Sequence, residues 1–140
     1  MDHGVADRVD LEVVDVADGT AGWSPRYDLA LFVECVHDFP RPVEALRHAR
    51  SAVLPGGTVL VVDLRADETF TAPGDEVQRF IAAASAVWCL PQGLVGPEPE
   101  PIGTLIRPDT LRDLARRAGY ARVDIVPIEH PFWRFYRLTP

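Results

Sequence analysis

Ionisable side chains follow the apolar runs of this sequence at three places, and their types could do chemistry there. Asp15 ends the first run, residues 34–38 (Glu-Cys-Val-His-Asp) follow the second, and Asp63 lies near the end of the third. Such runs are typical of buried strands, and open α/β sheets bind ligands outside the carboxyl ends of their strands. We therefore expect these three strand ends to form one site.

His37 is the member of this set best suited to acid–base chemistry, because imidazole titrates near neutral pH. It could orient a substrate or take its proton, and the alternative is a structural histidine bound to backbone groups. Asp38 could contact a substrate, but its place before Pro40 also fits a turn. Asp63 is either a carboxylate of a substrate pocket or a hydrogen-bonded strand end.

The cysteines give no sign of metal or redox chemistry. Cys35 and Cys89 lie far apart and lack the spacing of a zinc site or a disulfide framework. Cys35 fits a small buried residue better than a nucleophile. The adjacent histidine and aspartate would need further ligands to bind a metal, and His48 and His130 are not placed to supply them. The sequence thus predicts no metal site.

Composition and charge argue against two kinds of partner, nucleic acids and membranes. The chain has 140 residues, a formal net charge of −7 and no lysine, which argues against a nucleic-acid surface. Close to half of the residues are hydrophobic, which suits one globular domain. The sequence contains neither the apolar core of a signal peptide nor a stretch of membrane-spanning length, so we expect no membrane contact and a cytoplasmic location.

The elements that must position the polar residues follow from hydrophobic periodicity. Residues 8–15 alternate as a strand, and residues 27–33 form the near-continuous apolar run of a central strand covered on both faces. Helical spacing begins at Pro42, and Pro55-Gly56-Gly57 ends that helix before a further strand over residues 58–64. Strand, helix and strand make a right-handed βαβ unit.

The second half of the chain begins with an expected helical insertion at about residues 65–103. Its helix, about residues 75–90, carries one apolar face that either docks on the domain or forms a pocket wall. A helix capped near Asp109 and closed by Gly119 follows. Residues 122–128 and 133–138 are two strands whose joint is too short for a parallel crossover, so they form an antiparallel hairpin. The apolar face of the insertion helix comprises Val77, Phe80, Ile81, Ala84 and Trp88.

Three stretches carry a resemblance to a known family. They are residues 34–39 (ECVHDF), residues 54–63 (LPGGTVLVVD), and the close of the chain, which includes RPDTL from Arg107 and HPFWRFYRL from His130. Together they resemble the carboxyl-terminal part of class I S-adenosylmethionine-dependent methyltransferases, in the branch that acts on small molecules. The resemblance covers nearly the whole chain.

The family's fold implies a partial Rossmann-like α/β sheet, doubly wound, whose last strand inserts in reverse between two parallel ones. The strands of this chain would be the third to the seventh of that fold. The first two strands are missing, with the glycine-rich loop that binds the donor, and the sequence has no GxGxG or GxGxxG pattern. Residues 1–140 would then form a single partial domain.

The resemblance also implies a cofactor, S-adenosylmethionine, and roles for individual residues. Asp15 and the Val16 amide would contact the adenine, and Glu34 and Cys35 would line the donor site. The acceptor would be a small molecule. The residue types and positions, rather than the resemblance, make His37 the candidate catalytic residue and Asp38, Asp63 and Trp88 the candidates for binding the acceptor.

Two functions remain open at this stage. One is methyl transfer by a truncated domain that is inactive as it stands. The other is a non-catalytic interaction or dimerisation module that derives from a methyltransferase and pairs with another copy through its exposed sheet edge.

Overall fold

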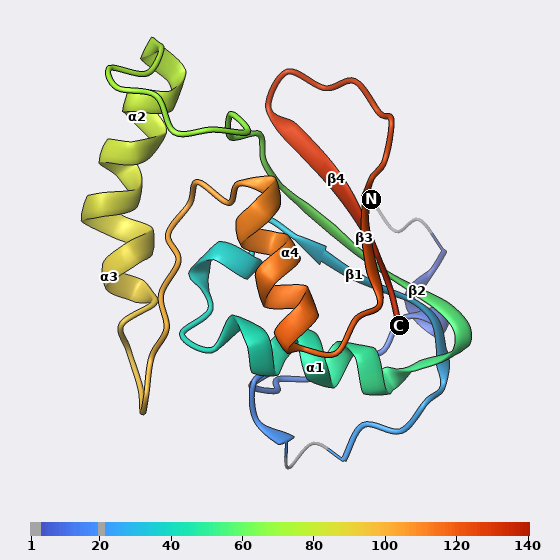
Figure 1. Cartoon of the computed structure of the whole chain (residues 1–140). Helices are drawn as coiled ribbons and strands as arrows, with labels where there is room; N and C mark the ends of the chain where they lie inside the picture. The colour runs from blue at the N-terminus through green and yellow to red at the C-terminus, as the bar shows by residue number, and fades with distance from the viewer. Residues whose placement is uncertain (1–3, 20–21) are drawn as a thin grey trace.

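The computed structural model describes residues 4–19 and 22–140, and these build one four-stranded sheet with helices beside it (Figure 1). The strand order is β1-β2-β4-β3. β1 and β2 are parallel, and β4 runs antiparallel to both of its neighbours, β2 and β3. The reversed strand inside the sheet confirms the predicted partial methyltransferase topology. The strands are β1 (Tyr27–Val33), β2 (Val53–Leu64), β3 (Arg122–Ile125) and β4 (Trp133–Thr139).

Helices lie between β1 and β2 and between β2 and β3, whereas β3 leads directly into β4. The principal ones are α1 (Pro42–Ala52) and α4 (Pro108–Arg117), each with a proline in its first turn, where the missing N–H is not needed. The remaining elements are η1 (Ala6–Arg8), η3 (Val36–Asp38), α2 (Glu76–Ala84), the π-helical turn η4 (Ser85–Cys89) and α3 (Leu90–Gln92). No helix in residues 4–19 and 22–140 is both long and apolar enough to cross a bilayer.

The glycine pair at the start of β2 has a steric cause. Strand pairing begins earlier than predicted, at Val53, and the register with β1 shifts between Tyr27 and Leu29. A Cβ on Gly57 would lie 2.9 Å from the Leu54 carbonyl oxygen and 3.1 Å from the Asp28 carbonyl oxygen. Only glycine allows the two strands to approach so closely here.

One face of the sheet is covered by α1 and α4, which lie on the same side in Figure 1. Val59, Val61 and Leu138 are fully buried on that face. Tyr120 joins the helices, because its hydroxyl donates a 2.8 Å hydrogen bond to the Leu46 carbonyl. The hydrophobic core of the chain therefore lies between this face and the two helices.

The opposite face is uncovered along β1. Leu29, Leu31 and Val33 alternate with the buried Phe32 and are more than half exposed. β1 is also an edge strand, since it pairs only with β2 in the part of the chain that the structure describes. The prediction of a central strand covered on both faces is therefore wrong for this chain.

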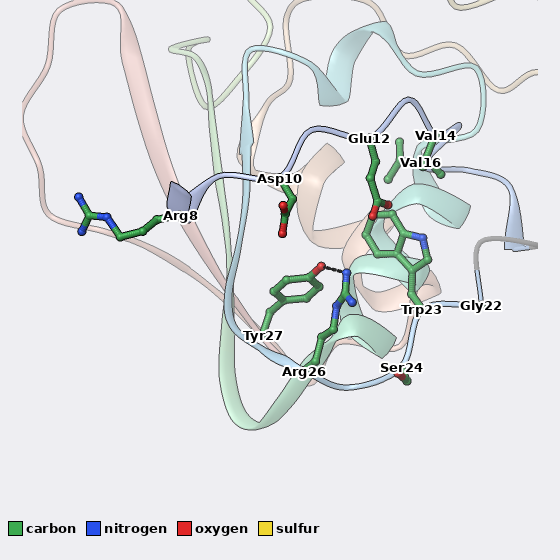
Figure 2. Close-up of a pocket in the computed structure, with 10 residues that line it drawn as sticks. All are labelled: Arg8, Asp10, Glu12, Val14, Val16, Gly22, Trp23, Ser24, Arg26 and Tyr27. Atoms are coloured by element: carbon green, nitrogen blue, oxygen red, sulfur yellow. Dashed lines mark hydrogen bonds between the residues drawn. The ribbon is translucent and has the colours of Figure 1, made fainter. Parts of the chain in front are cut away.

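The predicted strand over residues 8–15 is also wrong. Residues 9–15 have no regular secondary structure, and Leu11 and Val13 are almost fully exposed. Alternating apolar residues favour an extended chain, but a strand also needs hydrogen-bonding partners on a neighbouring strand. β1 lies across a cavity and supplies none (Figure 2).

The helix of the insertion forms within one residue of its predicted start, where the Asp75 carboxylate accepts a 2.8 Å hydrogen bond from the Gln78 amide. Its apolar face does not dock on the domain as a whole, which one interpretation of the sequence expected. Ile81 is buried, whereas Phe80 and Trp88 are about three quarters exposed. In Figure 1, α2 and α3 lie at one side of the molecule, away from the sheet.

Candidate active site

The carboxyl ends of β1 and β2 meet at one edge of the sheet, as the sequence predicted. The Glu34 amide donates a 2.9 Å hydrogen bond to the Val62 carbonyl, which continues the strand pairing by one residue. Glu34 itself has φ +52°, a left-handed conformation that costs a side-chain-bearing residue about 1–3 kcal/mol. This reversal ends β1 and leads directly into η3, which carries His37.

His37 and Asp63 form a buried pair at this edge. His37 is 5% exposed and Asp63 is fully buried. The His37 Nδ1 donates a 2.7 Å hydrogen bond to Asp63 Oδ1, which also accepts a 2.9 Å bond from the Leu64 amide. A carboxylate on Nδ1 fixes the ring orientation and keeps the proton of the neutral imidazole on Nδ1. The lone pair that can accept a proton is then on Nε2. That arrangement suits a general base.

The charges around His37 tune its basicity. Burial alone lowers the pKa of a histidine, but the hydrogen bond and charge of Asp63, with the charges of Asp38 and Glu34, outweigh burial, and the pKa is raised. Asp38 lies on the other side of the ring, with its Oδ1 3.5 Å from His37 Nε2. The imidazole therefore sits between two carboxylates.

Three carboxylate oxygens of this cluster accept no hydrogen bond from the described residues. They belong to Glu34 (Oε1), Asp38 (Oδ1) and Asp63 (Oδ2), and all three atoms are buried. Burial and the nearby Asp63 charge raise the pKa of Glu34 to about 7. Buried acceptors without a donor are costly, so this edge is suited to receive a hydrogen-bond donor or a cation.

The cysteines lie near the same cluster. Burial raises the pKa of Cys35 to about 11, so its thiol is protonated at neutral pH and is a poor nucleophile. Cys89, from η4, is brought beside His37 and Asp38, with ligand atoms within 4.8 Å of one another. Glu34, His37 and Asp63 form a second set of this kind. The linear spacing of the sequence, from which no metal site was expected, does not reveal either set.

Asp15 and Val16 lie apart from this cluster. Asp15 closes a turn, because its Oδ1 accepts a 2.8 Å hydrogen bond from the Ala17 amide, and its Oδ2 lies 3.6 Å from Arg41. The Val16 carbonyl accepts a 3.0 Å hydrogen bond from His48 Nδ1. These contacts match the alternative in which a strand-end aspartate binds its own loop.

Trp88 lies next to Cys89 in the chain and is 71% exposed, so it does not close a pocket over His37 in this structure. Thr104 is a functional candidate that sequence reasoning missed. It is 4% exposed and its hydroxyl contacts the Cys89 thiol: burial raises the pKa of Cys89, and the contact with Thr104 opposes that rise. It comes from a loop without periodicity, and we find no pattern in the sequence that indicates it.

Comparisons with known proteins agree with this fold. No protein-family model and no curated protein sequence matches the chain. Among solved structures, an O-methyltransferase family protein from Burkholderia thailandensis matches 98% of this chain with a TM-score of 0.69 and 20% identity. A structure of PigF with SAH matches 98% at a TM-score of 0.70 and 22% identity. TnmH matches 98% at a TM-score of 0.68 and 23% identity.

The chain spans only part of these proteins. It covers 37% of the Burkholderia protein and of PigF, and 36% of TnmH. The order of the strands and the reversed β4 agree with this similarity of fold. The chain has the fold of the carboxyl-terminal part of a class I S-adenosylmethionine-dependent methyltransferase.

Proposed function

We propose that this chain is the acceptor-side part of a methyltransferase that moves a methyl group from S-adenosylmethionine to a hydroxyl group of a small molecule. The observation that carries the proposal is the buried His37–Asp63 pair at the carboxyl edge of the sheet. The description of one similar structure as an O-methyltransferase family protein supports oxygen as the acceptor atom. PigF, another similar structure, was solved with SAH.

His37 would act through Nε2, because Asp63 holds the proton on Nδ1. His37 Nε2 would accept the proton of the acceptor hydroxyl. The oxygen of that hydroxyl would take the methyl group while the carbon–sulfur bond of the sulfonium breaks and its electron pair stays on sulfur. The charge that develops on the imidazolium is stabilised by Asp63 and Asp38. The Cys35 thiol takes no part in this step.

The residues present fit a sulfonium donor in part. The unpartnered carboxylate oxygens of Glu34 and Asp63 could face a cation, and we propose that Glu34 and Cys35 line the donor site. When bound, S-adenosylmethionine supplies an activated methyl group, so the protein contributes mainly alignment, worth up to ~7–11 kcal/mol. We also propose adenine contacts from Asp15 and Val16, although the side chain of Asp15 is engaged with Ala17 in this structure.

The acceptor would lie above the His37 cluster, against Asp38, Asp63 and the helix that carries Trp88. Closing that pocket requires the exposed Trp88 to gain a partner on its outer side. Since the chain covers little more than a third of the similar proteins, we expect most donor contacts to be absent from it. Losing two or three charge-assisted hydrogen bonds, at roughly 1.5–3 kcal/mol each, would take a micromolar site to millimolar or weaker.

Two measurements test this proposal. In calorimetric titration, the chain alone should show no micromolar binding of S-adenosylmethionine, and a one-to-one micromolar isotherm would show that the donor site is complete without further strands. In the longest in-frame product of the gene that contains this chain, His37→Ala should reduce methyl transfer at least about a hundredfold while donor binding persists. Arg112→Ala, on the exposed surface of α4, is the control and should retain transfer, and equal losses in both variants would remove His37 from the mechanism.

A second candidate function is a non-catalytic interaction module. The unpaired edge of β1 favours it, because an exposed edge is a template for pairing with another chain. The in-frame product also separates the two candidates. Normal folding and self-association without donor binding or methyl transfer would support the interaction module and exclude the enzyme.

A further inference from the structure

We propose that two copies of this chain exchange their amino-terminal segments, so that residues 9–14 of each copy pair with the free edge of β1 in the other. The partner is a second copy of the same chain. This inference goes beyond methyl transfer, because it requires neither donor nor acceptor and rests on surfaces away from His37.

The edge of β1 carries no feature that would prevent pairing. It has no proline and no lysine, and Asp28 is its one charged residue. A groove of about 400 Å³ runs beside it, lined among others by Trp23, Leu29, Leu31 and Phe32. An unprotected edge next to an apolar groove is suited to receive an extended strand, with backbone hydrogen bonds on one side and apolar contacts on the other.

Residues 9–14 have the apolar alternation of a strand but form no regular secondary structure in this chain. Val9, Leu11 and Val13 alternate along the segment and are 52%, 92% and 106% exposed. Val9 is already extended, with φ −126° and ψ 119°. The segment therefore has the pattern of a strand and begins in an extended conformation at Val9, and it pairs with no strand in the part of the chain that the structure describes.

The segment does not reach its own β1. It is tied to α1 at its carboxyl end, through Asp15 to Arg41 and through the Val16 carbonyl to His48. A cavity of about 700 Å³ separates it from the start of β1 (Figure 2). Closing that cavity within one copy would pull the anchored residues away from α1, whereas residues before the anchor can extend outward to a second copy.

A second copy fits both surfaces at once. Each chain supplies one unpaired segment, residues 9–14, and one unpaired strand edge, that of β1. A two-fold exchange pairs both, which is the geometry of domain swapping. Arg26, which directly precedes β1, carries the charge opposite to that of Asp10 and Glu12 of the segment, whereas Asp28 of β1 carries the same charge as they do. In Figure 2, the carboxylates of Asp10 and Glu12 point into the cavity across from Tyr27 and Trp23, beside Arg26. The exchange therefore brings into contact, between copies, groups that a cavity separates within one copy.

Sedimentation equilibrium of the full chain tests the exchange. We expect a dimer whose dissociation constant rises at least about tenfold in Leu11→Asp, because a carboxylate replaces an apolar contact in the new strand pair. Leu11 is almost fully exposed, so this change should leave the fold of each copy intact. Phe80→Asp is the matched control, because Phe80 is 75% exposed on α2, and it should leave the dimer unchanged.

A disulfide test identifies the paired segments. In chains with Cys35 and Cys89 replaced by serine, a Leu11→Cys copy mixed with a Leu31→Cys copy should form a cross-linked heterodimer. A chain that carries both substitutions and cross-links only within itself would overturn the exchange. So would a monomer at every concentration, or a dimer that Phe80→Asp weakens as much as Leu11→Asp does, since that would place the interface on α2.

Discussion

The two faces of the sheet share strands but differ in what covers them. On one face, α1 and α4 bury Val59, Val61 and Leu138 completely, and on the other Leu29 and Leu31 remain more than half exposed. Both faces present aliphatic residues, so β-propensity does not account for the difference. It depends instead on which helices reach each face, and the helices of this chain supply cover for only one.

Truncating one leucine on each face tests the difference between the two faces most directly. Leu138→Ala, on the covered face, should lower the free energy of unfolding by about 2–5 kcal/mol, because it leaves a cavity in the core. Leu31→Ala, on the uncovered face, should lower it by less than about 1 kcal/mol. Urea unfolding of the two variants at low protein concentration measures both changes.

The same pair reports on association. If Leu31→Ala costs as much as Leu138→Ala even in dilute solution, the uncovered face is buried in the protein as it exists in water. If its cost grows with protein concentration, association provides the cover, and Leu11→Asp should abolish the concentration dependence.

Glu34 joins the exposed and the buried region, because it lies where the exposed strand β1 reaches the buried His37–Asp63 pair. Burial and the Asp63 charge raise its pKa from 4.5 to about 7, so the folded chain binds this proton more tightly than the unfolded chain does. The stability that Glu34 contributes is present below pH 4.5 and is lost as the pH rises toward 7. Glu34→Gln removes that loss. At pH 8 the free energy of unfolding of this variant should therefore exceed that of the wild type by on the order of 1 kcal/mol, after allowance for solvent screening.

Urea titrations at a series of pH values measure this effect. His37 also has a raised pKa, and its contribution likewise falls as the pH rises, so the control is Glu34→Gln in a His37→Ala background. A difference between wild type and Glu34→Gln that does not change between pH 4.5 and 8 would contradict the assigned cause.

Much of the fold could be predicted because local patterns decide it. The bounds of β1 were predicted without error, α1 and α4 nearly so, and the antiparallel hairpin follows from the short joint between its strands. Residues 8–15 show the limit of such patterns, because their alternation predicted a strand that no neighbour pairs with. Edge pairing is a non-local property, and periodicity alone does not report it.

For the candidate site, the sequence predicted which strand ends carry the polar residues but not how those residues pair. Two of the three polar ends, at Glu34 and Asp63, meet as expected, and Asp15 lies apart from them in its own turn. The hydrogen bond between His37 and Asp63 joins residues 26 apart and depends on the left-handed turn at Glu34, which a side-chain-bearing residue rarely adopts. Thr104 and Cys89 reach the site only through tertiary packing.

A smaller loss is expected at the contact between the two covering helices. Tyr120→Phe removes the hydroxyl that donates to the Leu46 carbonyl but keeps the buried ring, so the free energy of unfolding should fall by about 0.5–1.5 kcal/mol. Thermal and urea unfolding would measure it. No loss would indicate that packing of the ring alone joins α1 to the chain after α4, and Tyr120→Leu then tests the ring.

The smallest effect is expected on the outer surface of the covered side, at Glu100 and Arg117. The Arg117 guanidinium donates two hydrogen bonds to the Glu100 carboxylate, with N–O distances of 2.5 and 2.6 Å, and this contact lowers the pKa of Glu100. Its contribution is therefore present above pH 4.5 and is lost as the pH falls through the lowered pKa, which is the opposite sign to Glu34. Because the pair is exposed, Glu100→Gln should cost at most about 1 kcal/mol at pH 7, and less in high salt. Urea unfolding at low and high ionic strength measures this, and a cost that salt does not reduce would mean that the pair is shielded from solvent.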